Sequence, residues 1–82
     1  MNDVKETFMV ISNKQTFEKI QEYYLKKGCR WFAGEYKIPH IVDAKYIRCD
    51  EYNNLTYGSS LTNTYLIGHK QIYLKPNILD IY

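Results

Sequence analysis

The chain of 82 residues is long enough for one small domain, because a chain of this length buries roughly 60% of the surface that its unfolded form exposes. Its apolar content of 45% excludes a disordered chain, and its formal charge of +2 is not the strong basic excess of a typical nucleic-acid-binding domain. No stretch approaches the roughly 18 apolar residues of a membrane helix and no signal peptide is visible, so we expect an intracellular protein.

An apolar run followed by a capping signal opens the chain. Residues 8–11 are rich in strand formers and predict a first strand. Ser12, with Gln15 three residues later, fits a capping box, in which side chains satisfy backbone amides that have no partner at a helix N-terminus. A helix is therefore predicted to begin at residue 13.

The next segment has the pattern of an amphipathic helix. Phe17, Ile20 and Tyr24 recur at spacings of three and four, and neither glycine nor proline interrupts residues 13–27. Gly28 follows two lysines and is free to adopt the left-handed conformation in which many helices end. We predict one continuous helix over residues 13–27 and no second helix of more than two turns.

The rest of the chain alternates short apolar and polar segments, which is typical of strands and turns. The predicted elements are a strand over residues 29–33, a loop over 35–44, a hairpin of 45–50 and 55–58 around a turn at 51–54, and a last strand over 71–74, with the apolar tail 78–82 packed back on the domain. This order predicts an α+β fold in a single domain of residues 1–82: a small, mainly antiparallel sheet of four to five strands with one helix packed on one face.

Several of these features occur together in a fixed order. They are the strand at residues 8–11, the helix through Gly28, Trp31, and the hairpin stretches 45–48 and 55–58. In this order they resemble a loose class of small accessory proteins encoded by tailed bacteriophages, and the likeness spans nearly the whole chain. The resemblance implies a viral protein made early in infection, which acts on host machinery or host defence in the cytoplasm of the infected bacterial host.

The sequence shows no local metal-binding or catalytic motif. Cys29, His40, Cys49 and His69 are widely separated, whereas a zinc site needs three or four ligands, usually with local spacing. No serine or cysteine lies in a recognisable nucleophile elbow or phosphate loop. We therefore expect no metal, no cofactor and no enzymatic activity, and we interpret both cysteines as reduced core residues.

Nine tyrosines are the most unusual feature of the composition. Because side chains alternate along a strand, Ile47 and Cys49 share one face. If that face packs against the helix, Tyr46 and Arg48 point outward, and Tyr57 would join them from the partner strand. An exposed patch of two tyrosines and an arginine is typical of a protein-interface hot spot and also of a base-stacking platform, although an ordinary sheet surface has the same composition.

The first hypothesis is therefore a phage-encoded, non-enzymatic protein that binds a host macromolecule, most simply a host protein, and inhibits a defence or takeover target. The alternative is a nucleic-acid or nucleotide-binding module that uses tyrosine stacking together with lysines. A third alternative is a structural or dimerising accessory protein, and no membrane partner is expected. The predicted binding residues are Tyr46, Arg48, Tyr57, Lys37 and Lys45.

Overall fold

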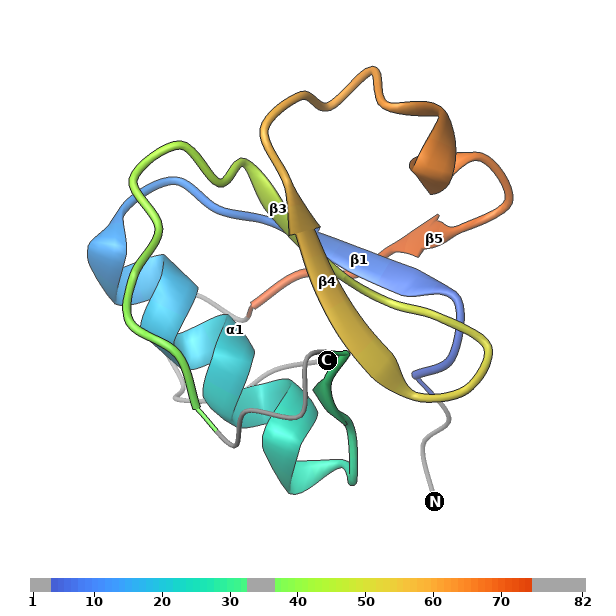
Figure 1. The fold of residues 1–82 in the computed structure, drawn as a ribbon, viewed down its shortest axis with the longest axis horizontal. Coiled ribbons are helices and arrows are strands. Elements are labelled where there is room, and N and C mark those ends of the chain that lie inside the picture. Colours follow the sequence, from blue (N-terminus) through green and yellow to red (C-terminus); the bar gives the residue numbers. More distant parts are fainter. Residues whose placement is uncertain (1–3, 33–36, 75–82) are drawn as a thin grey trace.

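The computed structural model describes residues 4–32 and 37–74 (Figure 1). The strands are β1 (Thr7–Val10), β2 (Arg30–Trp31), β3 (Tyr46–Cys49), β4 (Asn54–Gly58) and β5 (Lys70–Gln71), with the α-helix α1 (Lys14–Lys26) and the short 3-10 helix η1 (Thr64–Leu66). The predicted α+β class, with one α-helix on one face of a small sheet, is confirmed for these residues. None of the helices that they form is both long enough and apolar enough to cross a membrane.

The five strands form one sheet in the order β2-β4-β3-β1-β5. The central pairs β1–β3 and β3–β4 are antiparallel, whereas the two edge strands run parallel to their neighbours. The sheet is therefore mixed rather than mainly antiparallel. Figure 1 shows α1 on one side of the sheet and the connection from β4 to β5, which contains η1, on the other side.

The observed elements lie close to the predicted ones. The first strand lies one residue earlier than predicted, and the predicted hairpin is formed by β3 and β4. The last strand, β5, begins at Lys70 and is shorter than predicted. The strand predicted over residues 29–33 is observed as β2, Arg30–Trp31, and its predicted end at residue 33 lies outside the described residues, as does the apolar tail at 78–82.

The N-terminus of α1 is capped by Asn13 rather than by the predicted Ser12. The Asn13 Oδ1 atom accepts hydrogen bonds from the Thr16 backbone N–H at 2.8 Å and from the Thr16 hydroxyl at 2.9 Å. Both Ser and Asn are good N-caps, but the first helical bond runs from the Phe17 N–H to the Asn13 carbonyl. The Ser12 hydroxyl contacts the Thr16 hydroxyl instead, so the predicted capping box with Gln15 is wrong.

The helix α1 ends at Lys26 and is stopped by a turn at Gly28, the stop residue that the sequence predicts. Gly28 has a φ of +94°, its N–H donates to the Leu25 carbonyl, and the Cys29 N–H donates to the Tyr24 carbonyl. These two bonds form a Schellman motif, which requires the left-handed conformation that glycine adopts without strain. The turn directs the chain immediately into β2 and places Trp31 beside the helix.

The core lies between α1 and the sheet. Its completely buried apolar side chains are Met9, Phe17, Ile20, Tyr24, Ile47, Cys49 and Leu55. The Tyr24 hydroxyl lies 2.9 Å from the Thr7 hydroxyl, which donates its own proton to the Val4 carbonyl, so Tyr24 is the donor in this pair. Burial raises the pKa of Tyr24 well above its ordinary value of 10.0.

Candidate functional site

The loop of the β3–β4 hairpin is shorter than the sequence predicts. The Asp50 carboxylate accepts hydrogen bonds from the backbone N–H groups of Tyr52 at 2.8 Å and Asn54 at 2.9 Å. Asn53 adopts a left-handed conformation with a φ of +65°, which asparagine tolerates better than most residues. A backbone hydrogen bond from the Asp50 N–H to the Asn54 carbonyl, 3.0 Å long, then closes a loop of residues 51–53, one residue shorter than predicted.

This shorter loop changes the register of the hairpin. Tyr57 lies opposite Ile47, and Arg48 lies opposite Thr56. Because a shift of one residue moves side chains to the other face of a strand, Tyr57 is on the helix-facing side of the sheet. The prediction that Tyr57 joins Tyr46 and Arg48 is therefore wrong.

Tyr46 lies on the predicted face but is not exposed. The side chains of Tyr46 and Arg48 do point away from α1, yet Tyr46 is only 1% exposed. Its ring packs edge to face against Phe8, with the ring centroids 6.3 Å apart. It also occupies the space above Gly58, where a Cβ atom would collide with the ring. Burial raises the pKa of Tyr46, and the nearby Arg48 charge only partly opposes that effect.

Arg48 is half-buried and already engaged by other residues of the chain. Its guanidinium lies over the ring of Tyr65, 5.5 Å from the centroid, and its Nη1 atom donates to His69 Nε2 at 3.2 Å. Tyr65 belongs to η1 and His69 precedes β5, so the connection from β4 to β5 folds over this face of the sheet. The predicted outward patch of two tyrosines and an arginine therefore does not form.

The two predicted lysines lie apart from this cluster. Lys37 forms an ion pair with Glu22, with 3.8 Å between Nζ and Oε2 and both side chains more than half exposed. Lys45 is exposed immediately before β3, where its backbone N–H donates to the Gly58 carbonyl at 2.7 Å. The five predicted binding residues thus do not form one continuous site.

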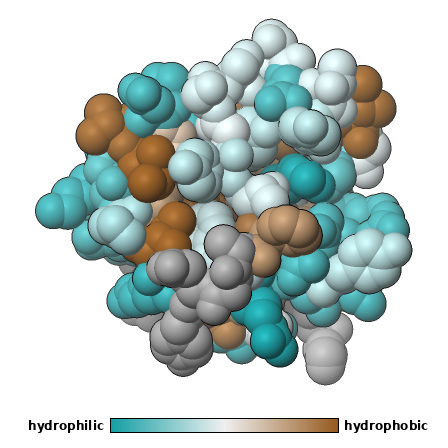
Figure 2. All heavy atoms as spheres, viewed as in Figure 1, coloured by the Kyte–Doolittle hydropathy of each residue, from teal (hydrophilic) through white to brown (hydrophobic). Residues whose placement is uncertain are grey.

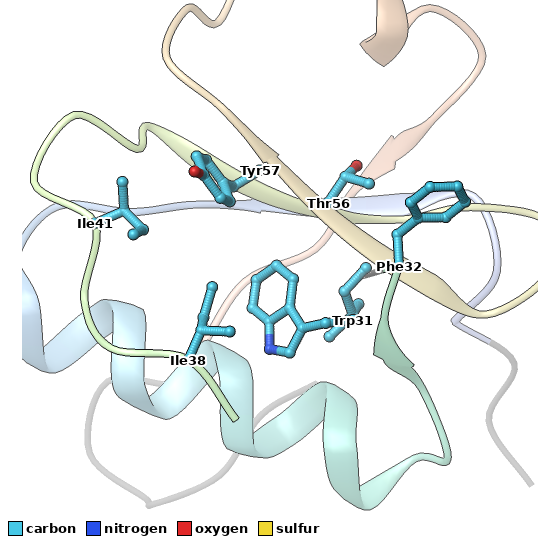
Figure 3. Close-up of a pocket in the computed structure, with 7 residues that line it drawn as sticks. Trp31, Phe32, Ile38, Ile41, Thr56 and Tyr57 are labelled. Carbon is cyan, nitrogen blue, oxygen red and sulfur yellow. The ribbon is translucent and has the colours of Figure 1, made fainter. Parts of the chain in front are cut away.

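The structure instead forms an apolar groove of about 430 Å³ on the helix-facing side (Figure 3). Its lining comes from β2 and the residue that follows it, from β4 and from the loop 37–45: Trp31, Phe32, Ile38, Ile41, Leu55, Thr56 and Tyr57. In Figure 3 the indole of Trp31 lies beside Ile38 of the loop and below Tyr57 of β4. Among the predicted binding residues, Tyr57 alone contributes to this groove.

Trp31 forms the floor of the groove and rests on the helix. Trp31 is 4% exposed, and its ring is nearly parallel to the ring of Phe17, with centroids 6.5 Å apart. Tyr57 meets the same indole edge-on, with centroids 6.4 Å apart. These contacts anchor Trp31 to α1 through Phe17 and to β4 through Tyr57.

Gln21 of α1 holds the floor and the loop together. Its Oε1 atom accepts from Trp31 Nε1 at 2.7 Å and from the Ile38 N–H at 2.8 Å, and its Nε2 atom donates to the Ile38 carbonyl at 3.1 Å. Gln21 is 1% exposed, and the sequence analysis missed it. Its position, four residues after Phe17 and three before Tyr24, places it on the apolar stripe, and this spacing was the available signal.

The rim of the groove is apolar and accessible. Phe32 is 72% exposed and Tyr57 is 47% exposed, and Val42 on the neighbouring loop is 81% exposed. Figure 2 shows apolar side chains gathered on the left of the molecule, over the loop that precedes β3. None of the described lining residues is charged. The groove is therefore suited to burying an apolar or aromatic group, with the Tyr57 hydroxyl as a polar contact at its edge.

A metal site is not found in the described part of the chain. Across residues 4–32 and 37–74, no group of three His, Cys, Asp or Glu side chains is placed to hold a metal ion. Comparison with known proteins finds no match, whether to a protein-family model, a curated protein or a solved structure. The function is therefore inferred from the groove itself.

Proposed function

We propose that this chain is a non-enzymatic binding protein that holds a partner protein at the groove. The observation that carries this proposal is the exposure of Phe32 and Tyr57 beside a floor, Trp31, that Gln21 fixes in place. Aromatic residues contribute most of the binding energy at protein interfaces when they surround a pocket from which water is excluded. Because the floor residue Trp31 is held in place by Gln21 and Phe17, its side chain loses little entropy on binding.

The contact that the groove accepts is a large apolar side chain of the partner. Its volume of about 430 Å³ is within the range of sites that enclose small groups. Burying one such side chain contributes on the order of 2 kcal/mol, and the exposed rim adds further contact area. The uncharged lining imposes no requirement for an ionic partner at this point.

The partner that we propose is a protein of a bacterial host, which the chain would inhibit as part of counter-defence or takeover. The support for this step is the resemblance to accessory proteins of tailed bacteriophages, carried by the helix that ends at Gly28, by Trp31 and by the hairpin. In that setting the chain acts in the cytoplasm of the infected cell.

A nucleic-acid-binding function has less support from the geometry. Base stacking on a basic surface requires exposed aromatic rings beside available cations. Tyr46 is buried, and Arg48 already contacts Tyr65 and His69. Lys37 lies beside the carboxylate of Glu22. Salt-sensitive binding of an oligonucleotide would favour this alternative.

The test compares capture of bacterial proteins by the tagged chain and by its Phe32→Ala, Tyr57→Ala double variant. We expect one protein to be retained by the wild-type chain and lost by the variant, with affinity reduced by roughly 30-fold or more. Tyr52→Ala is the matched control, because Tyr52 is 73% exposed but does not line the groove. Its affinity should equal that of the wild type.

Two results would contradict the proposal. Equal loss of the captured protein in Tyr52→Ala would show that exposed tyrosines act without regard to the groove. Salt-sensitive binding of a labelled single-stranded oligonucleotide, with no captured protein, would favour the nucleic-acid alternative. Thermal unfolding of each variant provides the folding control, and changes of less than about 1 kcal/mol are expected at these exposed positions.

A further inference from the structure

Two cysteine side chains meet inside the domain. Cys29 follows the turn that ends α1 and Cys49 ends β3, and their Sγ atoms lie 3.3 Å apart although the residues are 20 positions apart in sequence. Cys29 is 4% exposed and Cys49 is completely buried. The expectation that both are core residues is confirmed, whereas their contact was not predicted.

The backbone on both sides fixes this contact. The Cys29 N–H donates to the Tyr24 carbonyl, and the next residue, Arg30, donates to the Asn53 carbonyl. Cys49 is paired with Thr7 of β1 on one side and with β4 on the other. From 3.3 Å, the two sulfur atoms need to approach by about 1.3 Å to reach the length of a disulfide bond. Such a shift is within reach of small changes in the two side-chain torsions.

We propose that Cys29 and Cys49 form a dithiol site that hydrogen peroxide oxidises to an intramolecular disulfide. Peroxide suits this site because it is small and Cys29 is barely exposed. The Cys29 sulfur attacks one peroxide oxygen, so that an S–O bond forms, the O–O bond breaks, and a sulfenic acid and one water result. The Cys49 sulfur then attacks the Cys29 sulfur, and the hydroxyl leaves with the Cys49 proton as a second water. One peroxide accepts the two electrons that the two thiols lose.

The surroundings of Cys49 suit it to this second step. Its Sγ atom lies 3.6 Å from the Asp50 carbonyl and 3.7 Å from Asn53 Oδ1, both as acceptors of the thiol proton. With its proton directed toward these oxygens, the sulfur turns a lone pair toward Cys29. Cys29 is the more exposed of the two and is therefore the first to react.

The disulfide would join the two ends of the segment 29–49. This segment carries Trp31, Phe32, Ile38 and Ile41, which form much of the groove lining. Linking its ends restricts the unfolded chain, and closing a loop of this length is expected to raise the melting temperature by about 5–15 °C after some native-state strain. Oxidation of the two thiols depends on their own geometry and does not depend on what the groove binds.

The test is oxidation of the folded full chain with a few equivalents of hydrogen peroxide, followed by alkylation and peptide mass mapping. We expect both thiols to disappear together, a linked pair of peptides carrying Cys29 and Cys49 with the loss of two hydrogens, and a higher melting temperature that a thiol reductant reverses. Cys49→Ser should stop at a sulfenic acid on Cys29 that dimedone traps, with no rise in melting temperature.

Peptide mapping of the oxidised wild-type chain shows whether the disulfide forms, even if a serine variant folds poorly. A linkage that appears only in denaturant would overturn the proposal, because the folded contact would then play no part. Independent oxidation of each sulfur to sulfinic acid, or disulfides only between separate chains, would overturn it as well.

Discussion

The two faces of the sheet are both covered, but in different ways. One face packs against α1 through regularly spaced side chains such as Ile47 and Leu55. The other face is covered by the connection from β4 to β5. On this face the ring of Tyr46, from β3, fills the space that Gly58 of β4 leaves open. Strand alternation therefore shows which residues share a face, but it does not show whether that face meets water.

The largest expected effect comes from truncating one large side chain on each face. Ile47→Ala should lower the free energy of unfolding by about 2–5 kcal/mol and Tyr46→Ala by about 3–5 kcal/mol, because both side chains are at most 1% exposed. Urea unfolding of both variants measures this. A change below about 0.5 kcal/mol for Tyr46→Ala would mean that its face is solvated, as the sequence alone predicted.

A smaller effect is expected from disturbing the contact between Tyr46 and Gly58, on the face of the sheet away from α1. Gly58→Ala should cost about 1–3 kcal/mol, because the added Cβ collides with the Tyr46 ring. In the Tyr46→Ala background the same substitution should cost almost nothing. A double-mutant cycle measures this coupling, and strictly additive effects would contradict the packing described.

The buried tyrosines predict an alkaline loss of stability that involves both faces. Burial raises the pKa of Tyr24 on the helix side and of Tyr46 on the other side above their ordinary value of 10.0. Above pH 10 the unfolded chain loses these protons while the folded chain retains them, so stability that is fully present below pH 10 falls as the pH rises. Each such group contributes a slope of about 1.4 kcal/mol per pH unit.

Tyr24→Phe should therefore flatten this decline, as measured by urea unfolding between pH 9 and pH 11. Tyr46→Phe should do the same to a smaller extent, since the positive charge of Arg48 partly opposes its shift. An unchanged slope in both variants would show that neither hydroxyl is held protonated by the fold.

The smallest expected effect concerns the outer cover. Arg48→Met keeps the apolar stem of the side chain but removes the cation over Tyr65 and the donor to His69. Because Arg48 is only half-buried, the cost should be about 0.5–1 kcal/mol, as measured by thermal unfolding. A cost above about 3 kcal/mol would mean that this single residue holds the whole connection in place.

Features that depend on local signals were predictable from the sequence. The helix could be predicted because its apolar stripe and the glycine that stops it lie within one short segment of the chain. The hairpin could be predicted because its two strands are separated only by a short polar turn. The cap was misplaced because Ser12 and Asn13 are adjacent and equally suitable.

The candidate site was less predictable, because it depends on contacts between distant segments. Tyr57 lies on the opposite face from the predicted one, because the left-handed conformation of Asn53 allows a hairpin loop one residue shorter than predicted. Tyr46 is buried by its packing against Phe8 of β1 and over Gly58 of β4, both of them distant from it in sequence. Gln21 and the loop residue Ile38 contact each other only after the chain folds back on α1. No local sequence pattern therefore predicts their hydrogen bonds.

The short edge strands described above also bear on how the protein behaves at high concentration. Among the described residues, β2 and β5 each contain two residues, and each carries a cation, Arg30 or Lys70. A short, charged edge offers few backbone groups with which another chain could continue the sheet. These edges therefore act as barriers to aggregation by strand addition.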